Sequence, residues 1–170
     1  MKILTLWLKA LFICSVVFVA GCGFALKGAG KPLLFTVVQL QSQANSWLAG
    51  DVAARLASRG VKLSTDVQAP VPRIALLDEA RDRTVVSTSA TGGVRQYQLK
   101  HSVTVQVYDG SARTWLEPVT FSQARDVDYN PSQVLAKEIE EQALLKDMQA
   151  ELVNAVMRRI EATNSIAAPK

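Results

Sequence analysis

The sequence predicts an α+β domain, and three observations indicate this fold class. A β-α-β pattern covers residues 33–63. Two long runs of alternating apolar and polar residues follow within residues 96–127 and are joined by a hairpin signal. One long helical pattern then covers residues 131–161. Strands and helices in this order are typical of a sheet with helices packed on it.

The β-α-β pattern begins with the apolar, β-branched run at residues 33–40, which predicts a buried strand. Ser46 is the expected N-cap of a helix over residues 47–59, and Gly60 supplies its C-terminal stop. The helix has a narrow apolar stripe made of Leu48, Val52 and Leu56. Because the next strand starts at once with Val61-Lys62-Leu63, the two strands could be parallel.

Hairpin strands form the middle of the chain. Residues 73–87 predict one long strand or two short ones, and the turn residues at 88–93 follow. The clearest strand covers residues 96–107, and Asp109-Gly110 leads into a return strand at 114–127. Within that return strand, Pro118 indicates an edge position or a bulge.

The last helix has a clear start signal. Asn130 is the expected N-cap, Pro131 occupies the first helical position, and the helical pattern continues to about Glu161. Its apolar face is predicted to comprise Leu135, Ile139, Leu145, Met148, Leu152, Val156 and Ile160. Residues 33–162 are therefore expected to form a single domain, and residues 163–170 a flexible tail.

The N-terminal segment resembles a lipoprotein export signal. Lys2 and Lys9 flank its start, an uncharged apolar run follows, and the small residues Ala20 and Gly21 precede Cys22. Cleavage there would remove residues 1–21 and leave Cys22 as an acylated first residue on a tether over residues 22–32. The alternatives are an ordinary secretory signal or a short membrane anchor, although the apolar run is shorter than the roughly twenty residues that span a bilayer.

Composition excludes several classes of site. The formal charge of +4 falls to +2 once Lys2 and Lys9 leave with the signal, so nucleic-acid binding is not expected. Cys14 leaves as well and Cys22 is acylated, so neither a disulfide nor a cysteine metal site is predicted. The single histidine, His101, argues against a histidine-based metal cluster or a catalytic triad.

The remaining polar groups favour no cofactor and no catalytic centre. His101 falls on the apolar face of its strand, where a core histidine is the simplest interpretation. Three acidic residues alternate with arginines at residues 78–83, which favours a solvated turn over an acid–base pair. No nucleophile or phosphate-loop motif accompanies the Ser, Thr and Gly residues at 87–93.

The mature chain resembles the LPS-assembly lipoprotein LptE (RlpB) family in the order and spacing of four motifs. These are Gly21-Cys22-Gly23-Phe24 with Leu26, Leu56 with Gly60-Val61-Lys62-Leu63, Tyr97-Gln98-Leu99, and Asn130-Pro131-Ser132-Gln133-Val134-Leu135-Ala136-Lys137. The resemblance implies a two-layer sandwich in which two helices pack on a mixed four- to five-stranded β-sheet.

The resemblance also implies a function without catalysis. Family members are lipid-anchored in the outer membrane by an acylated, typically palmitoylated, cysteine, and they lie inside the LptD β-barrel as a plug. They help to assemble the barrel and bind lipopolysaccharide on its way to the outer leaflet. The alternative is a general envelope-assembly scaffold that is not specific to lipopolysaccharide export.

The family pattern assigns lipid A contact to two basic positions. Lys137 matches the lysine near the start of the last helix, whereas Ala90 stands where relatives have an arginine. Arg95 lies nearby and is the candidate substitute. Other basic residues gather in the same half of the chain, namely Arg81, Arg83, Lys100 and Arg113. They form either a solvated rim or further partners for lipid A phosphates, and the polar strand faces could touch the lumen of a barrel.

Overall fold

The computed structural model describes residues 33–166, with side chains to residue 164. The predicted signal peptide (1–21), Cys22 and the tether (22–32) therefore lie outside the described residues. Within the described range, no helix combines the length and the apolar character needed to cross a membrane.

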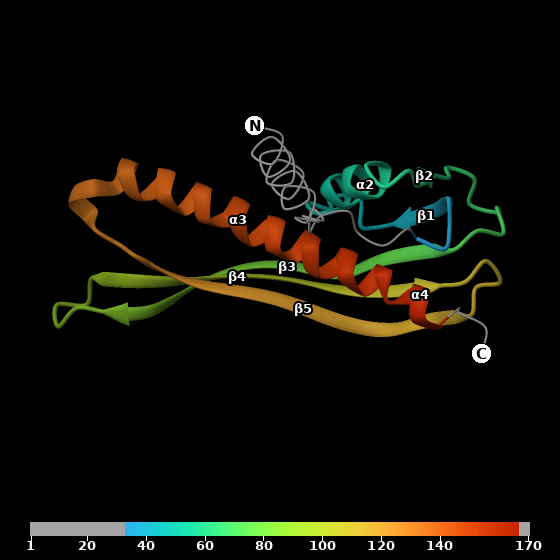
Figure 1. Cartoon of the computed structure of the whole chain (residues 1–170). Helices are drawn as coiled ribbons and strands as arrows, with labels where there is room; N and C mark the ends of the chain where they lie inside the picture. The colour runs from blue at the N-terminus through green and yellow to red at the C-terminus, as the bar shows by residue number, and fades with distance from the viewer. Residues whose placement is uncertain (1–32, 167–170) are drawn as a thin grey trace, which may run out of the picture. The chain divides into compact units, whose positions relative to one another are not determined.

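The structure is a five-stranded mixed sheet with a short helix and a long helix on one face (Figure 1). The strand order is β2-β1-β3-β4-β5. The strands are β1 (Val37–Gln41), β2 (Lys62–Leu63), β3 (Arg73–Thr88), β4 (Val94–Tyr108) and β5 (Thr114–Asp128), and the helices are α2 (Ala49–Ala57) and α3 (Val134–Glu161). β1 pairs in parallel with β2 and β3, whereas β3, β4 and β5 pair antiparallel. The predicted α+β fold class, with two helices on a mixed sheet, is confirmed.

Helix α2 starts slightly later than the sequence suggests. The Ser46 hydroxyl accepts hydrogen bonds from the backbone N–H groups of Leu48 (3.3 Å) and Ala49 (2.9 Å), so it satisfies two otherwise unpaired donors. Gly60 adopts a φ of 77°, a left-handed conformation that glycine reaches without a Cβ clash. The chain can therefore leave the helix and enter β2 directly.

Strand β3 is one long strand with a bulge, which decides between the two predicted possibilities. Its register with β4 shifts between Leu77 and Ala80, and Asp78 there has a φ of 49°. A bulge of this kind inserts an extra residue and increases the local twist. The charged segment at residues 78–83 is consequently part of a strand, and the prediction of a turn there was wrong.

Pro118 lies both at a sheet edge and at a bulge. β5 pairs only with β4, and the register passes from Val105↔Val119 to Val107↔Leu116. Two residues of β5, Glu117 and Pro118, therefore oppose the single residue Gln106. The missing N–H of proline costs no ladder hydrogen bond at such a place.

Helix α3 begins where its cap signal predicts. The Asn130 side chain accepts a hydrogen bond from Ser132 N–H (3.0 Å), a 3₁₀ turn covers Pro131–Gln133, and the α-helix continues to Glu161. Arg59, just after α2, pairs with Glu161 at the end of this helix.

The predicted apolar face of α3 was wrong in its first half. Leu135 and Ile139 are 72% and 65% exposed, whereas Met148 and the later members are buried. Ile139 lies nine residues before Met148, and at about 100° per residue this is roughly two and a half turns. Ile139 therefore points to the side of the helix opposite Met148.

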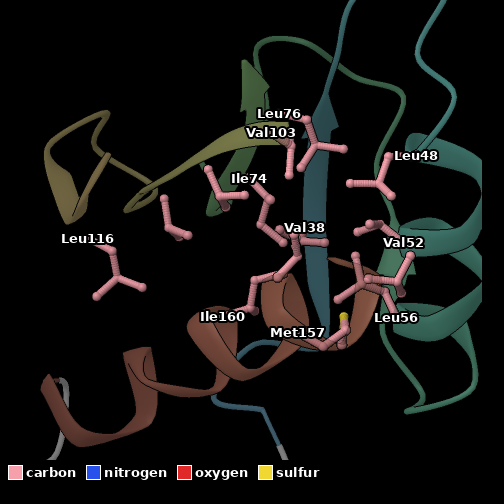
Figure 2. Packing of buried hydrophobic residues seen from close by; sticks show 14 of the residues in the cluster. Val38, Leu48, Val52, Leu56, Ile74, Leu76, Val103, Leu116, Met157 and Ile160 are labelled. Carbon is pink, nitrogen blue, oxygen red and sulfur yellow. The ribbon is translucent and has the colours of Figure 1, made fainter. Parts of the chain in front are cut away.

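The core consists of two apolar clusters. The larger one joins α2, β1, β3, β4 and the second half of α3, and Figure 2 shows side chains from these elements pointing toward one another. Its labelled members include Val38, Val52, Ile74, Val103 and Ile160. The smaller cluster lies farther along the sheet and contains Leu99, Val127 and Met148.

The predicted flexible tail begins with ordered residues. Thr163–Ile166 form a short helix, α4, and Thr163 is buried. Leu34 N–H donates to Asn164 Oδ1 (3.1 Å), which connects this helix to the chain just before β1. Residues 167–170 lie outside the described range.

Gly110 in the β4–β5 turn provides a test of this packing. A Cβ there would lie 2.6 Å from the Pro70 carbonyl oxygen, so the backbone must shift. We expect Gly110→Ala to lower the free energy of unfolding by about 1–3 kcal/mol in urea denaturation. The control is Gly50→Ala, whose new Cβ meets nothing within 4 Å. In helix α2 it should stabilise by about 0.5–1 kcal/mol. Equal stability of the two variants would contradict the described approach of Gly110 to Pro70.

Candidate functional site

The two basic residues selected from the sequence lie in one pocket. Arg95 and Lys137 both line a cavity of about 550 Å³ between the β3–β4 turn, the end of β5 and the start of α3. The other lining residues are mostly polar and include Ser89, Thr91 and Gln133. The cavity falls within the size range of small-ligand sites.

Arg95 is positioned by a tight turn. Ser89 N–H donates to Gly93 O (2.7 Å), Gly92 N–H donates to Ser89 O (2.9 Å), and Gly92 has a φ of 84°. Tyr129 N–H donates to the Arg95 carbonyl (2.8 Å), which holds the end of β5 against the start of β4. Arg95 is consequently fixed in the strand beside the turn, while its side chain lines the pocket.

Ala90, which occupies the expected arginine position, lies in the same turn. Its neighbours Ser89 and Thr91 line the pocket and are joined by a hydroxyl contact of 3.0 Å. The pocket is therefore lined by the two hydroxyl residues that flank position 90 in the sequence. Sequence spacing indicated Arg95 only by its nearness to Ala90.

Lys137 lies in the first turns of α3 and is not fully available. Its ammonium is 2.7 Å from Glu140 Oε2, and the Lys137 side chain is 24% exposed. Asp128, which also lines the pocket, accepts a hydrogen bond from Gln96 Nε2 (3.2 Å). The pocket therefore has two cations, partly offset by two carboxylates, together with several uncharged hydrogen-bonding groups. Such a site suits a phosphate better than an apolar ligand.

Two of the other basic residues considered from the sequence are engaged within the protein. Arg83 lies 3.9 Å from the Tyr97 ring centroid and pairs with Glu141 (3.1 Å). Arg113 pairs with Asp109 (3.1 Å) in the β4–β5 turn, at the other end of β4 from Arg95. Neither Arg83 nor Arg113 lines the Arg95–Lys137 pocket.

A group of polar, partly exposed residues lies where α2, β3, β4 and α3 meet. Arg81 stacks 4.2 Å from the Trp47 ring centroid and donates to Gln149 Oε1 (2.9 Å). Glu79 Oε2 accepts a hydrogen bond from the backbone N–H of Trp47 (3.2 Å). The sequence interpretation of residues 78–83 as solvated therefore missed Glu79. The alternation of apolar and polar residues before and after residues 78–83 could have indicated a continuous strand, and with it a partly buried Glu79. No cluster that could hold a metal occurs among the residues described.

His101 is a core histidine, as its strand position predicts. It is 2% exposed, and its ring lies 4.9 Å from that of Trp47. Burial lowers the pKa of His101, and the nearby positive charge of Arg81 lowers it further. His101 Nδ1 has no hydrogen-bond partner within the described part of the chain. The imidazole is therefore held in its neutral form.

The sheet face opposite the helices is polar. Gln98 Nε2 donates to Asp126 Oδ1 (3.0 Å), and the Thr104 and Thr120 hydroxyls are 2.8 Å apart. These are cross-strand pairs between β4 and β5. Because the buried valines of β4 alternate with them, one face of the sheet is dry and the other is available to a polar partner.

Comparison with known proteins assigns this chain to a family. The family model described as LptE, lipopolysaccharide-assembly, matches residues 35–160. The chain belongs to the LptE family. It is a lipoprotein of lipopolysaccharide assembly, and the predicted family is confirmed.

Relatives agree with this assignment along most of the chain. The LPS-assembly lipoprotein LptE of Photorhabdus laumondii is 29% identical over 163 residues, which cover 94% of this chain and 85% of the relative. That of Pectobacterium atrosepticum is 26% identical, with 88% and 82% covered.

Solved structures support the fold. Lipoprotein B of Nitrosomonas europaea, determined by NMR in solution, has a TM-score of 0.70 at 25% identity and covers 84% of this chain and 93% of its own. Rare lipoprotein B of Shewanella oneidensis has a TM-score of 0.64 at 25% identity, with 76% and 96% covered.

The buried imidazole predicts a pH-dependent stability. Because the folded-state pKa of His101 lies below the unfolded value of 6.5, the unfolded chain binds the proton first as the pH falls. We expect the free energy of unfolding to decrease below about pH 6.5 and this contribution to level off below the folded-state pKa. Urea denaturation between pH 4.5 and 8 would measure it.

The matched variant is His101→Gln, which cannot titrate. The difference in stability between wild type and variant should be constant above pH 7 and should shrink toward lower pH. A difference that stays constant across the whole range would show that burial does not disfavour the protonated imidazole.

Proposed function

We propose that this chain is a non-enzymatic outer-membrane lipoprotein that plugs the LptD β-barrel and supports the transport of lipopolysaccharide to the outer leaflet. In this proposal the Arg95–Lys137 pocket binds the phosphates of lipid A. The observation that supports it most is the convergence of these two residues, from different elements, on one polar cavity.

Phosphate binding follows from the chemistry of the pocket. A guanidinium and an ammonium form charge-assisted hydrogen bonds with phosphate oxygens, and the guanidinium can do so with two N–H groups at once. The hydroxyls of Ser89 and Thr91 lie beside Arg95 and add donors. Glu140 competes for Lys137, so a phosphate must displace this carboxylate or share the ammonium with it.

The polar sheet face is the proposed contact with the barrel. Its amide, hydroxyl and carboxylate side chains are already paired across β4 and β5, and this kind of surface suits the polar lumen of a large barrel. The helices cover the other face. The plug would therefore present one side of the sheet to the barrel wall without exposing its core.

Membrane attachment is proposed from the sequence. Acylated Cys22, followed by Gly23 instead of the Asp that marks inner-membrane retention in this class, would hold the domain at the outer membrane. Each buried methylene of an acyl chain contributes about 0.8 kcal/mol, so several chains give a lasting anchor.

The second candidate is a general envelope-assembly scaffold, which the polar sheet face would also suit. Depletion distinguishes the two functions. Loss of surface lipopolysaccharide with other barrels intact supports the first, whereas a broad loss of barrels with lipopolysaccharide transport intact supports the second.

Charge changes in the pocket should alter lipopolysaccharide affinity in opposite directions. Lys137→Gln removes a phosphate partner and should weaken binding roughly three- to tenfold, because a partly exposed charge pair contributes about 1 kcal/mol. Glu140→Gln releases the Lys137 ammonium and should strengthen binding. Arg95→Gln should weaken it as Lys137→Gln does. Binding of purified lipopolysaccharide to the detergent-solubilised lipoprotein measures all three.

Lys146→Gln is the matched control, since Lys146 is exposed on α3 and does not line the pocket. It should leave the affinity unchanged. The assignment fails if all four variants bind with wild-type affinity, or if Lys146→Gln weakens binding as much as Lys137→Gln.

Copurification tests the plug. A tagged lipoprotein, extracted from outer membranes in mild detergent, should bring down LptD in near-equal amount. Thr120→Trp places a bulky ring on the polar sheet face and should reduce that recovery. Lys146→Trp, on the exposed side of α3, should not. If Thr120→Trp recovers as much LptD as the wild type, the polar sheet face is not the barrel contact. If the wild-type sample contains no LptD, the plug hypothesis is wrong.

A further inference from the structure

Arg83 connects the sheet to the first half of α3. Its guanidinium donates to Glu141 Oε2 (3.1 Å) and lies 3.9 Å from the centroid of the Tyr97 ring. These contacts join three elements, because Arg83 belongs to β3, Tyr97 to β4 and Glu141 to α3. Arg83 itself does not line the Arg95–Lys137 pocket. Its influence on a ligand there would therefore be indirect.

The partner of Arg83 is also a neighbour of Lys137. Glu141 follows Lys137 by four residues in α3, and residues at this spacing lie next to each other on one side of a helix. The Lys137 ammonium nevertheless pairs with Glu140 Oε2 (2.7 Å), whose side chain is 59% exposed. The Glu141 side chain is only 19% exposed and pairs with Arg83. The less exposed of the two carboxylates is therefore taken by the arginine.

The exposure of each carboxylate determines how strongly it would hold Lys137. Water and salt screen the pair with Glu140, so a phosphate can compete for the ammonium. A pair with Glu141 would be screened less, because that carboxylate is mostly covered. With both carboxylates beside it, Lys137 would offer little positive charge to an anion. The ion pair with Arg83 prevents this arrangement.

Aromatic contacts connect Arg83 to the other cationic side of the pocket. A guanidinium stacked on an aromatic face is attracted by the ring and held in one orientation. Tyr97, on which Arg83 stacks, meets Tyr129 edge-on, with ring centroids 5.6 Å apart at 81°. Tyr129 lines the pocket, and its N–H donates to the Arg95 carbonyl (2.8 Å). Contacts of Arg83 therefore lead both to the helix that carries Lys137 and to the strand that carries Arg95.

We propose that Arg83 is a positioning residue for anion binding in the Arg95–Lys137 pocket. It holds Glu141 away from the Lys137 ammonium, so that a phosphate has to displace only the exposed carboxylate of Glu140. This role rests on the proposed lipopolysaccharide function for the identity of the anion, whereas the arrangement of charges does not depend on it. An arginine with a purely structural role would have no such dependence on the charge of Glu141.

The first test measures the binding of purified lipopolysaccharide to the full lipoprotein in detergent. Arg83→Gln should weaken binding roughly three- to tenfold, because Glu141 is released toward Lys137. Adding Glu141→Gln to this variant should restore the wild-type affinity. The matched control adds Glu138→Gln instead, at an exposed position of α3. It restores the same net charge but leaves Glu141 in place, so its affinity should stay low.

The second test needs no lipopolysaccharide. Trinitrobenzenesulfonate is an anionic reagent that modifies lysine side chains, and mass spectrometry of the resulting peptides gives the rate at Lys137. Arg83→Gln should slow this reaction about two- to threefold, because a second carboxylate pairs with the ammonium and repels the reagent. Glu141→Gln should restore the rate in the double variant. Lys146, exposed on the same helix, is the internal reference.

A conservative variant separates positioning from folding. Arg83→Lys can still pair with Glu141, so both the affinity and the reaction rate at Lys137 should stay near the wild-type values. Unfolding would speed the reaction at Lys137, so poor folding of Arg83→Gln cannot imitate the expected result.

The positioning role is overturned if Arg83→Lys slows the reaction as much as Arg83→Gln does, or if Arg83→Gln does not slow it. It is also overturned if Glu138→Gln restores binding as well as Glu141→Gln does. A slower reaction that Glu141→Gln reverses, combined with lipopolysaccharide binding that no variant alters, would support the positioning of Lys137 and contradict the proposed ligand.

Discussion

The alternation of side chains along β4 is the constraint on which the rest of the structure depends. Val103, Val105 and Val107 are buried on one side, and residues such as Gln98 and Thr104 lie on the other. β4 is hydrogen-bonded on both edges, to β3 and to β5, over most of its length. A slip of one residue would move the polar set into the core, so the hydrophobic pattern specifies the register strongly. The helices can then cover only the dry face, and the polar face remains for a partner.

Much of the fold could be predicted because it depends on short-range patterns. The cap at Asn130, the turn at Asp109-Gly110 and the dual character of Pro118 each follow from backbone preferences of neighbouring residues. The exposure of Leu135 and Ile139 could not be predicted in this way. It depends on where the sheet lies under a long helix, and a small angular drift over nine residues changes the side that a residue faces. The partial burial of Glu79 likewise could not be predicted, because it involves a contact with Trp47 from a distant part of the chain.

The sequence indicated which residues belong to the candidate site, but it did not show that they share a cavity. The family pattern indicated Lys137, and proximity to Ala90 in the sequence indicated Arg95. The two residues share a cavity because antiparallel pairing places the start of β4 beside the end of β5, and because the cap at Asn130 starts the last helix at the same place. The competing carboxylate of Glu140 is a helix-surface contact of the i,i+3 kind, which is readable from the sequence once the helix is assigned.

The separation of the core into two apolar clusters has a consequence for motion. The larger cluster contains seventeen buried residues from six helices and strands and their adjoining segments, whereas the smaller contains only Leu99, Val127 and Met148 with two partly buried leucines. Between them lies the polar contact of Trp47, His101 and Arg81. Less buried apolar area means a smaller free energy for local opening. Amide protons around the Arg95–Lys137 pocket should therefore exchange with solvent faster than those near Val103. The end of the molecule that holds the pocket can rearrange around a ligand while the other end stays folded.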